Sequence, residues 1–202
     1  MNKIAIGLSV HRAVEWQTVA ALVALLSATK GMMKLLMVPS PYIVHNRTQI
    51  VLQALGAGCT HLFFMDADIT CPAFTINQLL DSGKRVVGCA YNKRPSWAAN
   101  DSTTDRISTV QPLVDGKPFG IMRPHELPNE LFQCGGLGTG AMLIDLSVFQ
   151  EIEKPWFDIG RDESGAVTIS DDFWFCRQCI SAGIDIWCDP TIQIGHIGAY
   201  AY

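Results

Sequence analysis

The chain has 202 residues, of which 49% are hydrophobic and 17% are charged, and its formal net charge is -4. This length can bury a substantial core in one domain, and the composition is not that of a disordered chain. Neither sign of charge forms a long block, which disfavours nucleic-acid binding. No apolar run approaches the ~20 residues that a membrane span needs, so we expect a cytoplasmic protein.

Apolar runs and helical stripes alternate over the first ninety residues. The pattern predicts strands at 4–10, 34–38, 61–65 and 85–90, with helices at 14–28, 46–57 and 72–80. Such alternation is typical of parallel strands joined by right-handed crossovers. We therefore expect an α/β fold whose first half, 1–90, binds a nucleotide.

The rest of the chain begins irregularly. Residues 91–130 lack periodicity, and we predict a long mobile loop region of the kind that binds or covers a substrate. Order returns with strands predicted at 131–134, 141–144 and near 186 and 192, and with a helix at 171–182. The second half, 131–202, is expected to complete the site within a single domain that spans 1–202.

Seven cysteines are scattered through mostly apolar segments. An odd count without a dense framework predicts reduced thiols packed in the core. Cys176 and Cys179 form a C-x-x-C pair, but zinc would need a second pair of ligands. A metal or redox role for this pair stays the alternative.

Asp66 and Asp68 follow a predicted buried strand, at the edge where open α/β sheets bind ligands. A hard cation such as Mn²⁺ or Mg²⁺ takes carboxylate oxygens and bridges them to substrate phosphates. His196, after an apolar strand predicted at 191–194, offers an imidazole as a third ligand. The alternatives are that the acids cap turns and that the histidine is an ordinary surface residue.

Residues 135–140 contain four glycines. No lysine follows, and a strand rather than a helix comes next, so the segment is neither a P-loop nor a dinucleotide-binding loop. Its glycines are typical either of backbone that passes close to a substrate or of a simple bulge between strands.

Asp171 and Asp172 follow Ser170, which is placed to cap the predicted helix. Acids in a first turn are favourable for structural reasons alone. A carboxylate aimed into the ligand crevice can also accept a proton from an attacking hydroxyl, and Asp172 is our candidate for that general base. Asp171 is expected to orient the acceptor or the loop.

Six segments together carry a family resemblance: residues 46–47, 61–69, 88–94 with Trp97, 138–144, 170–176 and 195–198. In this order and spacing they resemble glycosyltransferases of the GT-A fold, specifically the small family-2-like enzymes of bacteria and phages. The resemblance covers nearly the whole chain. It implies a Rossmann-like nucleotide-diphospho-sugar transferase fold, with a mostly parallel central sheet flanked by helices and a small second sheet.

The resemblance also implies where a nucleotide-sugar donor would lie. Its base would sit near the end of the first strand, at Ser9, Val10 and His11. Arg47 would face the nucleotide. Asp66 would contact the ribose or sugar side and join the metal ligands.

On the diphosphate side, the resemblance implies that Asp68 and His196 hold the metal. The loop formed by Gly138, Thr139 and Gly140 would line the sugar and acceptor pocket.

Lys93 and Arg94 are implied to approach the diphosphate, although a solvated charged pair would need no such role. The chain departs from the family pattern at three places. Asp171 stands where Glu is usual and is one methylene shorter, Thr48 stands where Asn is frequent, and Asn92 stands where Pro is frequent.

We thus expect a glycosyltransferase that needs Mn²⁺ or Mg²⁺ and moves a sugar from a UDP-sugar to an acceptor hydroxyl with inversion, in a bacterial or phage-infected cell. The acceptor is left open among a glycan, a lipid-linked sugar, a protein and a modified nucleobase, and a homo-oligomer is compatible with the sequence. A sugar nucleotidyltransferase is the first alternative, but residues 9–13 lack the glycines that would hold a triphosphate. A non-catalytic binding module is the second.

Overall fold

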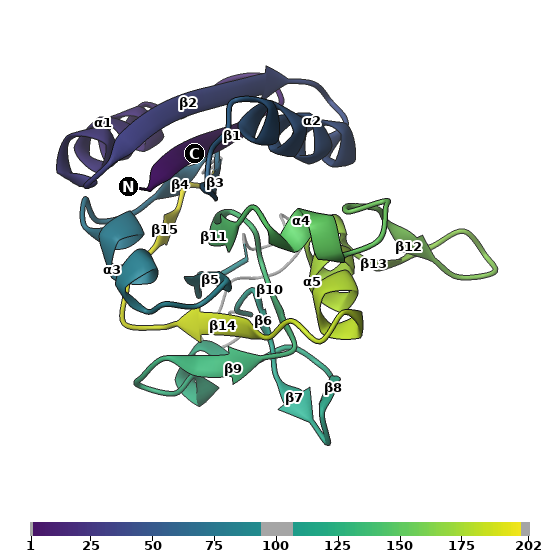
Figure 1. The fold of residues 1–202 in the computed structure, drawn as a ribbon. Helices are drawn as coiled ribbons and strands as arrows, with labels where there is room; N and C mark the ends of the chain where they lie inside the picture. Colours follow the sequence, from purple (N-terminus) through teal and green to yellow (C-terminus); the bar gives the residue numbers. More distant parts are fainter. Residues whose placement is uncertain (1, 94–106, 199–202) are drawn as a thin grey trace.

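A computed structural model of the protein describes residues 2–93 and 107–198 (Figure 1). Its central sheet has seven strands in the order β2-β1-β3-β11-β5-β14-β9. Along the chain their bounds are β1 Lys3–Val10, β2 Met32–Pro39, β3 His61–Asp66, β5 Val86–Cys89, β9 Phe132–Cys134, β11 Ala141–Asp145 and β14 Ile186–Asp189. Five strands point the same way, and β11 and β9 run antiparallel to their neighbours. The predicted α/β class with a mostly parallel sheet is confirmed.

Five helices pack on the two faces of this sheet, which Figure 1 shows from its β2 edge at the top to its β9 edge at the bottom. They are α1 Trp16–Ala28, α2 Ile43–Gly56, α3 Thr75–Asp81, α4 Val148–Glu151 and α5 Asp171–Ser181. Helices α1 and α3 share one apolar cluster with one face. Helices α2, α4 and α5 share the other cluster with the opposite face. The sheet is therefore covered on both sides, as buried strands require.

The first crossover shows how the sequence makes this layering. In α1, Leu22 and Leu25 are buried against the sheet, which gives the Ala- and Leu-rich helix its inward face. The chain then turns at Gly31, whose φ of +123° is open to glycine alone at low cost. A Cβ there would also lie 2.8 Å from the carbonyl oxygen of Asn2. Gly31 therefore lets the chain enter β2 directly beside β1.

The prediction of an irregular loop over 91–130 is wrong for much of its length. Residues 107–130 contain β6 Val110–Gln111, β7 Leu113–Val114, β8 Lys117–Pro118 and a 3-10 helix, η1 Pro124–Glu126. Asp115 and Gly116, both with positive φ, form the tight turn of the β7–β8 hairpin. These strands are too short to show a period in the sequence. Trp97 lies outside the described residues.

The strand predicted at 191–194 is also wrong. Thr191 lies in a turn, where its backbone N–H and its hydroxyl both donate to the Asp189 carboxylate at 3.0 and 2.6 Å. The strand comes later, as β15 Gly195–His196, and pairs with β4 Ile69–Thr70. Local hydrogen bonds of the aspartate thus override the apolar pattern.

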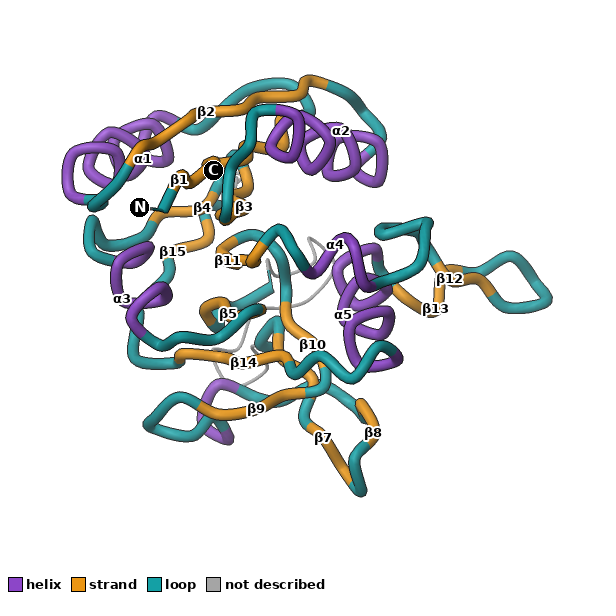
Figure 2. The backbone as a smooth tube through the Cα atoms, in the orientation of Figure 1, coloured by secondary structure: helices purple, strands orange, loops and turns teal. Residues whose placement is uncertain are grey.

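In place of one small second sheet, the described residues form four two-stranded ribbons (Figure 2). These are β10 Gly136–Leu137 with β6, β12 Gly160–Arg161 with β13 Val167–Ile169, β15 with β4, and β7 with β8. The predicted core thiols are confirmed: all seven cysteines are free, and six are buried. Within 2–93 and 107–198, no helix is long and apolar enough to cross a membrane.

Candidate active site

The candidate site lies where β1, β3 and β5 end and β11 begins. Ser9, at the end of β1, is in register with Asp66, the last residue of β3. The backbone N–H of Asp66 donates to the carbonyl oxygen of Gly140, at 3.1 Å, just before β11. Because parallel strands end here, side chains from distant parts of the chain meet at the carboxyl ends of these strands.

Arg47 of α2 is the centre of the first group of charged residues. Its guanidinium forms an ion pair with Asp171 and lies 3.6 Å, Nη2 to Oδ1, from Asp66. Asp172 is near enough to act on its charge. We call Arg47, Asp66, Asp171 and Asp172 the Arg47 cluster. The Arg47 side chain is only 5% exposed, so this charge is held inside the protein.

Electrostatics within the Arg47 cluster follow from burial and proximity. Burial alone would lower the pKa of Arg47, but the carboxylates, above all Asp171 and Asp66, raise it beyond its ordinary value. Burial raises the pKa of Asp171, although Arg47 acts in the opposite direction. The guanidinium therefore stays charged, and the Asp171 carboxyl holds its proton more tightly than an exposed aspartate.

Asp172 begins α5 beside Asp171. Its Oδ1 accepts hydrogen bonds from the Ser170 hydroxyl and from the backbone N–H of Phe173, the latter at 2.9 Å. Ser170 is the N-cap residue of α5, as predicted, but its hydroxyl makes no capping hydrogen bond and donates to Asp172 instead. Both bonds fix the carboxylate through Oδ1.

Asp68 and His196 form the second group. The β4–β15 pairing and the hydrogen bond from Ile197 N–H to the carbonyl oxygen of Asp68, at 2.8 Å, bring the two residues together. Imidazole Nε2 lies 3.4 Å from Asp68 Oδ2. This contact joins residues 128 positions apart, and it confirms that the predicted strand end and the distant imidazole meet.

A carbonyl fixes the tautomer of His196. The carbonyl oxygen of Asn92 lies 2.9 Å from Nδ1 and can only accept, so Nδ1 carries hydrogen. Nε2 then faces the Asp68 carboxylate either with a second proton or with a lone pair. The lone-pair form places two electron-rich atoms side by side, which is favourable only with a cation nearby.

Tyr91, which the sequence did not single out, connects the two groups. Its hydroxyl accepts a hydrogen bond from the Gly140 backbone N–H at 2.9 Å. Its ring packs edge-on against the His196 ring, with centroids 5.5 Å apart. Burial, and then the charge of Asp66, raise its pKa well above the ordinary value, so the phenol keeps its proton. Its position directly after β5, at the same sheet edge, was the signal that could have found it.

The glycine loop forms the floor of the site. A Cβ on Gly138 would lie 2.6 Å, and one on Gly140 2.5 Å, from the Tyr91 hydroxyl oxygen. A Cβ on Gly140 would also lie 2.8 Å from Asp66 Oδ2. Gly136, by contrast, belongs to strand β10. Glycine at 138 and 140 therefore lets the loop backbone approach the Tyr91 side chain closely. Gly136, near the start of the loop, belongs instead to a two-stranded ribbon.

The other predicted donor residues surround this floor. Ser9 and Thr139 are buried, and their hydroxyls have no hydrogen-bond partner among the described residues. Val10 is buried and His11 is exposed on the same strand end. The Lys93 ammonium lies 5.5 Å from the Phe173 ring centroid. Arg94 lies outside the described residues.

A metal bound here would need ligands beyond the His, Cys, Asp and Glu side chains that the structure describes. Within the described ranges, no three His, Cys, Asp or Glu side chains are gathered closely enough to hold an ion by themselves. Asp68 and His196 are paired, while Asp66 is directed to Arg47. Two protein ligands completed by phosphate oxygens and water fit the habits of Mg²⁺ and Mn²⁺. Participation of Asp66 stays a prediction.

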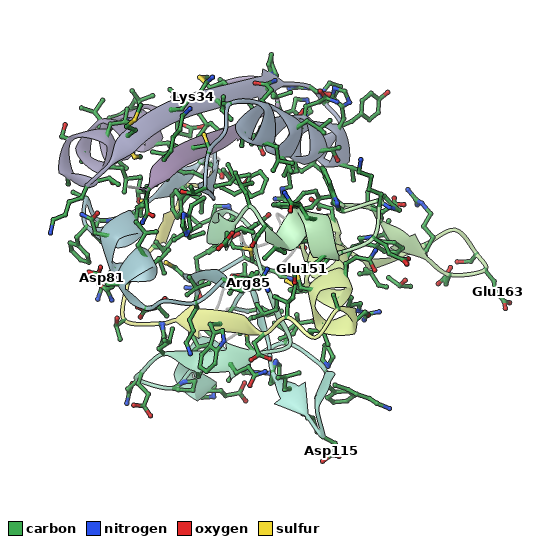
Figure 3. The ribbon with its side chains drawn as sticks, viewed as in Figure 1. Lys34, Asp81, Arg85, Asp115, Glu151 and Glu163 are labelled. Carbon is green, nitrogen blue, oxygen red and sulfur yellow. The ribbon has the colours of Figure 1, made fainter. Side chains whose placement is uncertain are left out.

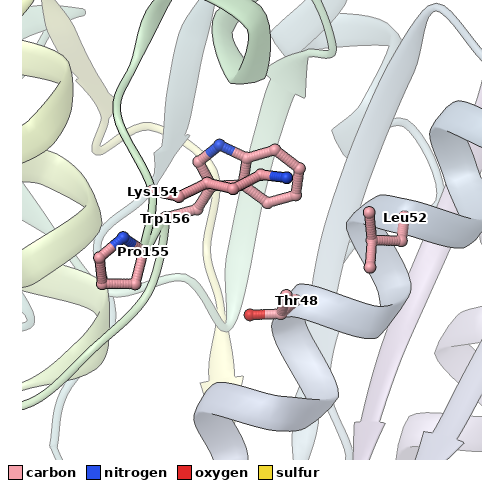
Figure 4. Close-up of a pocket in the computed structure, with 5 residues that line it drawn as sticks. All are labelled: Thr48, Leu52, Lys154, Pro155 and Trp156. Carbon is pink, nitrogen blue, oxygen red and sulfur yellow. The ribbon is translucent and has the colours of Figure 1, made fainter.

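A pocket elsewhere lies between α2 and the segment after α4 (Figure 4). Thr48 and Leu52 form one wall, and Lys154, Pro155 and Trp156 form the other. The Lys154 ammonium stands 4.7 Å from the Trp156 ring centroid. No carboxylate lines this pocket, so it lacks the groups that metal or acid–base chemistry would use.

Comparisons with known proteins inform the fold. No protein-family model matches the chain, and no curated protein matches it. Among solved structures, the crystal structure of A197 from STIV is similar, with a TM-score of 0.64 and 13% identity. The similarity covers 98% of this chain and 87% of that one. At this identity it shows a shared fold, consistent with a Rossmann-like arrangement.

Proposed function

We propose that this protein is a metal-dependent glycosyltransferase of the GT-A type, which transfers a sugar from a nucleotide-sugar, a UDP-sugar in the first instance, to an acceptor hydroxyl. One observation carries the proposal. Asp66, Asp68, Asp171 and Asp172 come together from two segments of the chain, 66–68 and 171–172, and Asp68 lies beside the His196 imidazole. Carboxylates and an imidazole gathered where parallel strands end are ligands that Mn²⁺ and Mg²⁺ use when they bridge a protein to substrate phosphates, which favours a substrate that brings phosphate with it.

The metal fits the second group of residues. Asp68 and His196 would hold Mn²⁺ or Mg²⁺, and a bound divalent cation would supply neutralising charge for a diphosphate leaving group. The Nδ1–H bond to the Asn92 carbonyl supports this role, because it directs the Nε2 lone pair toward Asp68.

Asp172 would act as the general base. Its carboxylate is fixed by Ser170 and Phe173 through Oδ1 and can take the proton of the acceptor hydroxyl at Oδ2. Attack from the face opposite the departing diphosphate would invert the anomeric carbon. Asp171 has a different part, because its ion pair with buried Arg47 fixes the first turn of α5 and so the direction of Asp172.

The buried hydroxyls of Ser9 and Thr139 support binding of a donor between the end of β1 and the glycine loop. Buried polar atoms are normally satisfied, and these two lie on either side of Asp66. A ribose or sugar hydroxyl is a partner of suitable chemistry.

A thermal-shift screen tests the proposal directly. The protein is melted with each nucleoside diphosphate and its sugars, with and without Mn²⁺. A ligand at one hundred times its dissociation constant adds about 2.7 kcal/mol of stability, equivalent to roughly 5–10 °C for a chain of this size. We expect one nucleotide to stand out, and only with the metal. Uniform melting with all donors would contradict the proposal.

A product assay then separates transferase from nucleotidyltransferase chemistry. The donor identified by melting is incubated with protein and Mn²⁺, with and without candidate acceptors. Release of nucleoside diphosphate is expected from a glycosyltransferase, and pyrophosphate formation from a sugar phosphate and nucleoside triphosphate marks the alternative. Metal-dependent binding with neither product would indicate a binding module.

A further inference from the structure

Charge is unevenly divided along the chain. Residues 1–65 contain five Lys or Arg and one acid, Glu15, for a net charge of +4. Residues 66–202 contain ten Lys or Arg and eighteen acids, for a net charge of -8. In the fold, β1, α1, β2 and α2 come from the positive segment and form the end of the molecule at the β2 edge of the sheet (Figure 1). Figure 3 shows Lys34 at this end and Asp81, Asp115 and Glu163 away from it.

Exposed apolar side chains gather at the same end. Of the fourteen large hydrophobic side chains exposed among the described residues, nine lie between positions 16 and 52. The most exposed are Tyr42 and Trp16, at 73% and 72%. In a protein whose surface apolar residues are otherwise scattered, a concentration of this kind marks an interaction surface.

Two elements share this surface. On α1, four residues spaced by three, four and three positions form one exposed stripe beside the buried face: Trp16, Val19, Val23 and Leu26. On β2, Leu35 and Met37 point to the sheet face that α1 covers, because Met33, two residues earlier, packs in the α1 cluster. We call these six residues the α1–β2 surface. Arg12 and Lys30 are exposed beside it, whereas Lys34 points to the opposite face of β2, with Leu36 and Val38.

We propose that the α1–β2 surface docks on an anionic lipid membrane, with its apolar side chains in the headgroup region and Arg12 and Lys30 on the lipid phosphates. An interfacial helix needs an apolar stripe, an aromatic residue at headgroup depth and flanking cations. Helix α1 has the stripe and Trp16, with Arg12 before it and Lys30 after it. This inference does not rest on the proposed function, because docking needs neither donor nor metal.

Charge disfavours two other occupants. A second copy placed across a two-fold axis would bring two positive ends, each with Lys34 in an edge strand, against each other. Nucleic acid would be held by phosphate contacts from many cations, whereas this surface is mainly aliphatic. An anionic lipid surface satisfies both the apolar and the cationic parts.

The test is cosedimentation of the full chain with vesicles of equal parts phosphatidylglycerol and phosphatidylcholine, and with phosphatidylcholine alone. We expect binding to the anionic vesicles that weakens as salt is added. Double variants Trp16→Gln with Val23→Gln, and Arg12→Glu with Lys30→Glu, should each weaken partitioning about tenfold or more. Melting temperature should not change, because these side chains are exposed.

A matched control lies at the other end of the molecule. Phe119, 71% exposed, and the exposed Lys117 belong to the region of the β7–β8 hairpin. Phe119→Gln with Lys117→Glu should leave vesicle binding unchanged. Equal binding to neutral vesicles, or equal loss in this control, would overturn the proposal. So would failure to bind vesicles combined with a dimer that Trp16→Gln with Val23→Gln converts to monomer, because the surface would then join two copies.

Discussion

The Arg47 cluster and the Asp68–His196 pair lie at one sheet edge but balance their charge differently. The Arg47 cluster contains its own permanent cation, held by α2 at 5% exposure against acids of β3 and α5. In the Asp68–His196 pair, which a backbone ladder holds, the carboxylate faces an imidazole that is charged only when a second proton is bound. The attraction between these two side chains therefore responds to a proton or a metal, whereas the ion pairs of the Arg47 cluster involve a permanent cation. Five predictions sharpen or break this distinction.

The largest expected effect is on turnover. Asp172→Asn should lower kcat by about 10²–10⁴-fold, because an amide cannot take the acceptor proton. Donor affinity, measured by titration with a nucleoside diphosphate, should stay the same. Asp81→Asn, at an exposed acid that ends α3, is the control and should be neutral. Unchanged kcat in Asp172→Asn would show that the base is another residue.

Arg47→Met should destabilise the fold most. It leaves the Asp66 and Asp171 carboxylates partly buried without their cation, which costs about 3–5 kcal/mol in unfolding free energy. Arg85→Met is the matched control, since Arg85 pairs with Glu151 at the surface and should lose less than about 1 kcal/mol. Urea unfolding measures both. Similar losses would mean that the buried ion pairs of the Arg47 cluster stabilise the fold no more than a surface pair does.

Metal affinity separates the two groups of residues. Asp68→Asn and His196→Gln should each weaken Mn²⁺ binding, measured calorimetrically in the presence of nucleoside diphosphate, by about 10–100-fold. Asp66→Asn tests its membership in the metal site. An equal loss would place Asp66 among the ligands, whereas an unchanged affinity would restrict it to the Arg47 cluster. Unchanged Mn²⁺ affinity in Asp68→Asn and His196→Gln would show that this pair does not bind the metal.

Gly140→Ala should destabilise the fold at the contact between the glycine loop and Tyr91. The added methyl would meet the Tyr91 hydroxyl and the Asp66 carboxylate, and overpacking of this kind costs about 1–3 kcal/mol. Gly56→Ala is the control, because Gly56 ends α2 with nothing within 4 Å of a Cβ, and alanine favours helix. Thermal unfolding compares them. Equal stability of Gly140→Ala and Gly56→Ala would show that the loop can accommodate the added methyl group.

The smallest effect concerns pH. Burial raises the pKa of Asp171, so the folded state holds this proton more tightly than the unfolded state. The carboxyl therefore contributes stability at low pH that is lost as pH rises through its folded pKa, from about pH 4 upward. The stability advantage of the wild type over Asp171→Asn should fall across that range in urea titrations. A growing advantage would mean that the pair with Arg47 lowers the pKa instead.

Much of the fold could be predicted because its signals are local. Residues 61–66 are apolar up to an aspartate, and β3 ends at that aspartate. Helices at 14–28 and 46–57 were placed within a few residues of α1 and α2 by their stripes. The short strands between 110 and 118 could not be found, since two residues show no period. The turn at Thr191 was missed because a side-chain bond to Asp189 decides it.

The sequence by itself determined which residues carry charge at the strand ends, because apolar runs and the acids that stop them are neighbours in the chain. Only the tertiary structure decided how those charges are partnered: Arg47 with Asp66 and Asp171, and His196 with Asp68. It also placed β11 antiparallel between β3 and β5 and brought Tyr91 between the two groups. These contacts join residues up to 128 positions apart, and such distances are set by packing of the whole core rather than by local preference.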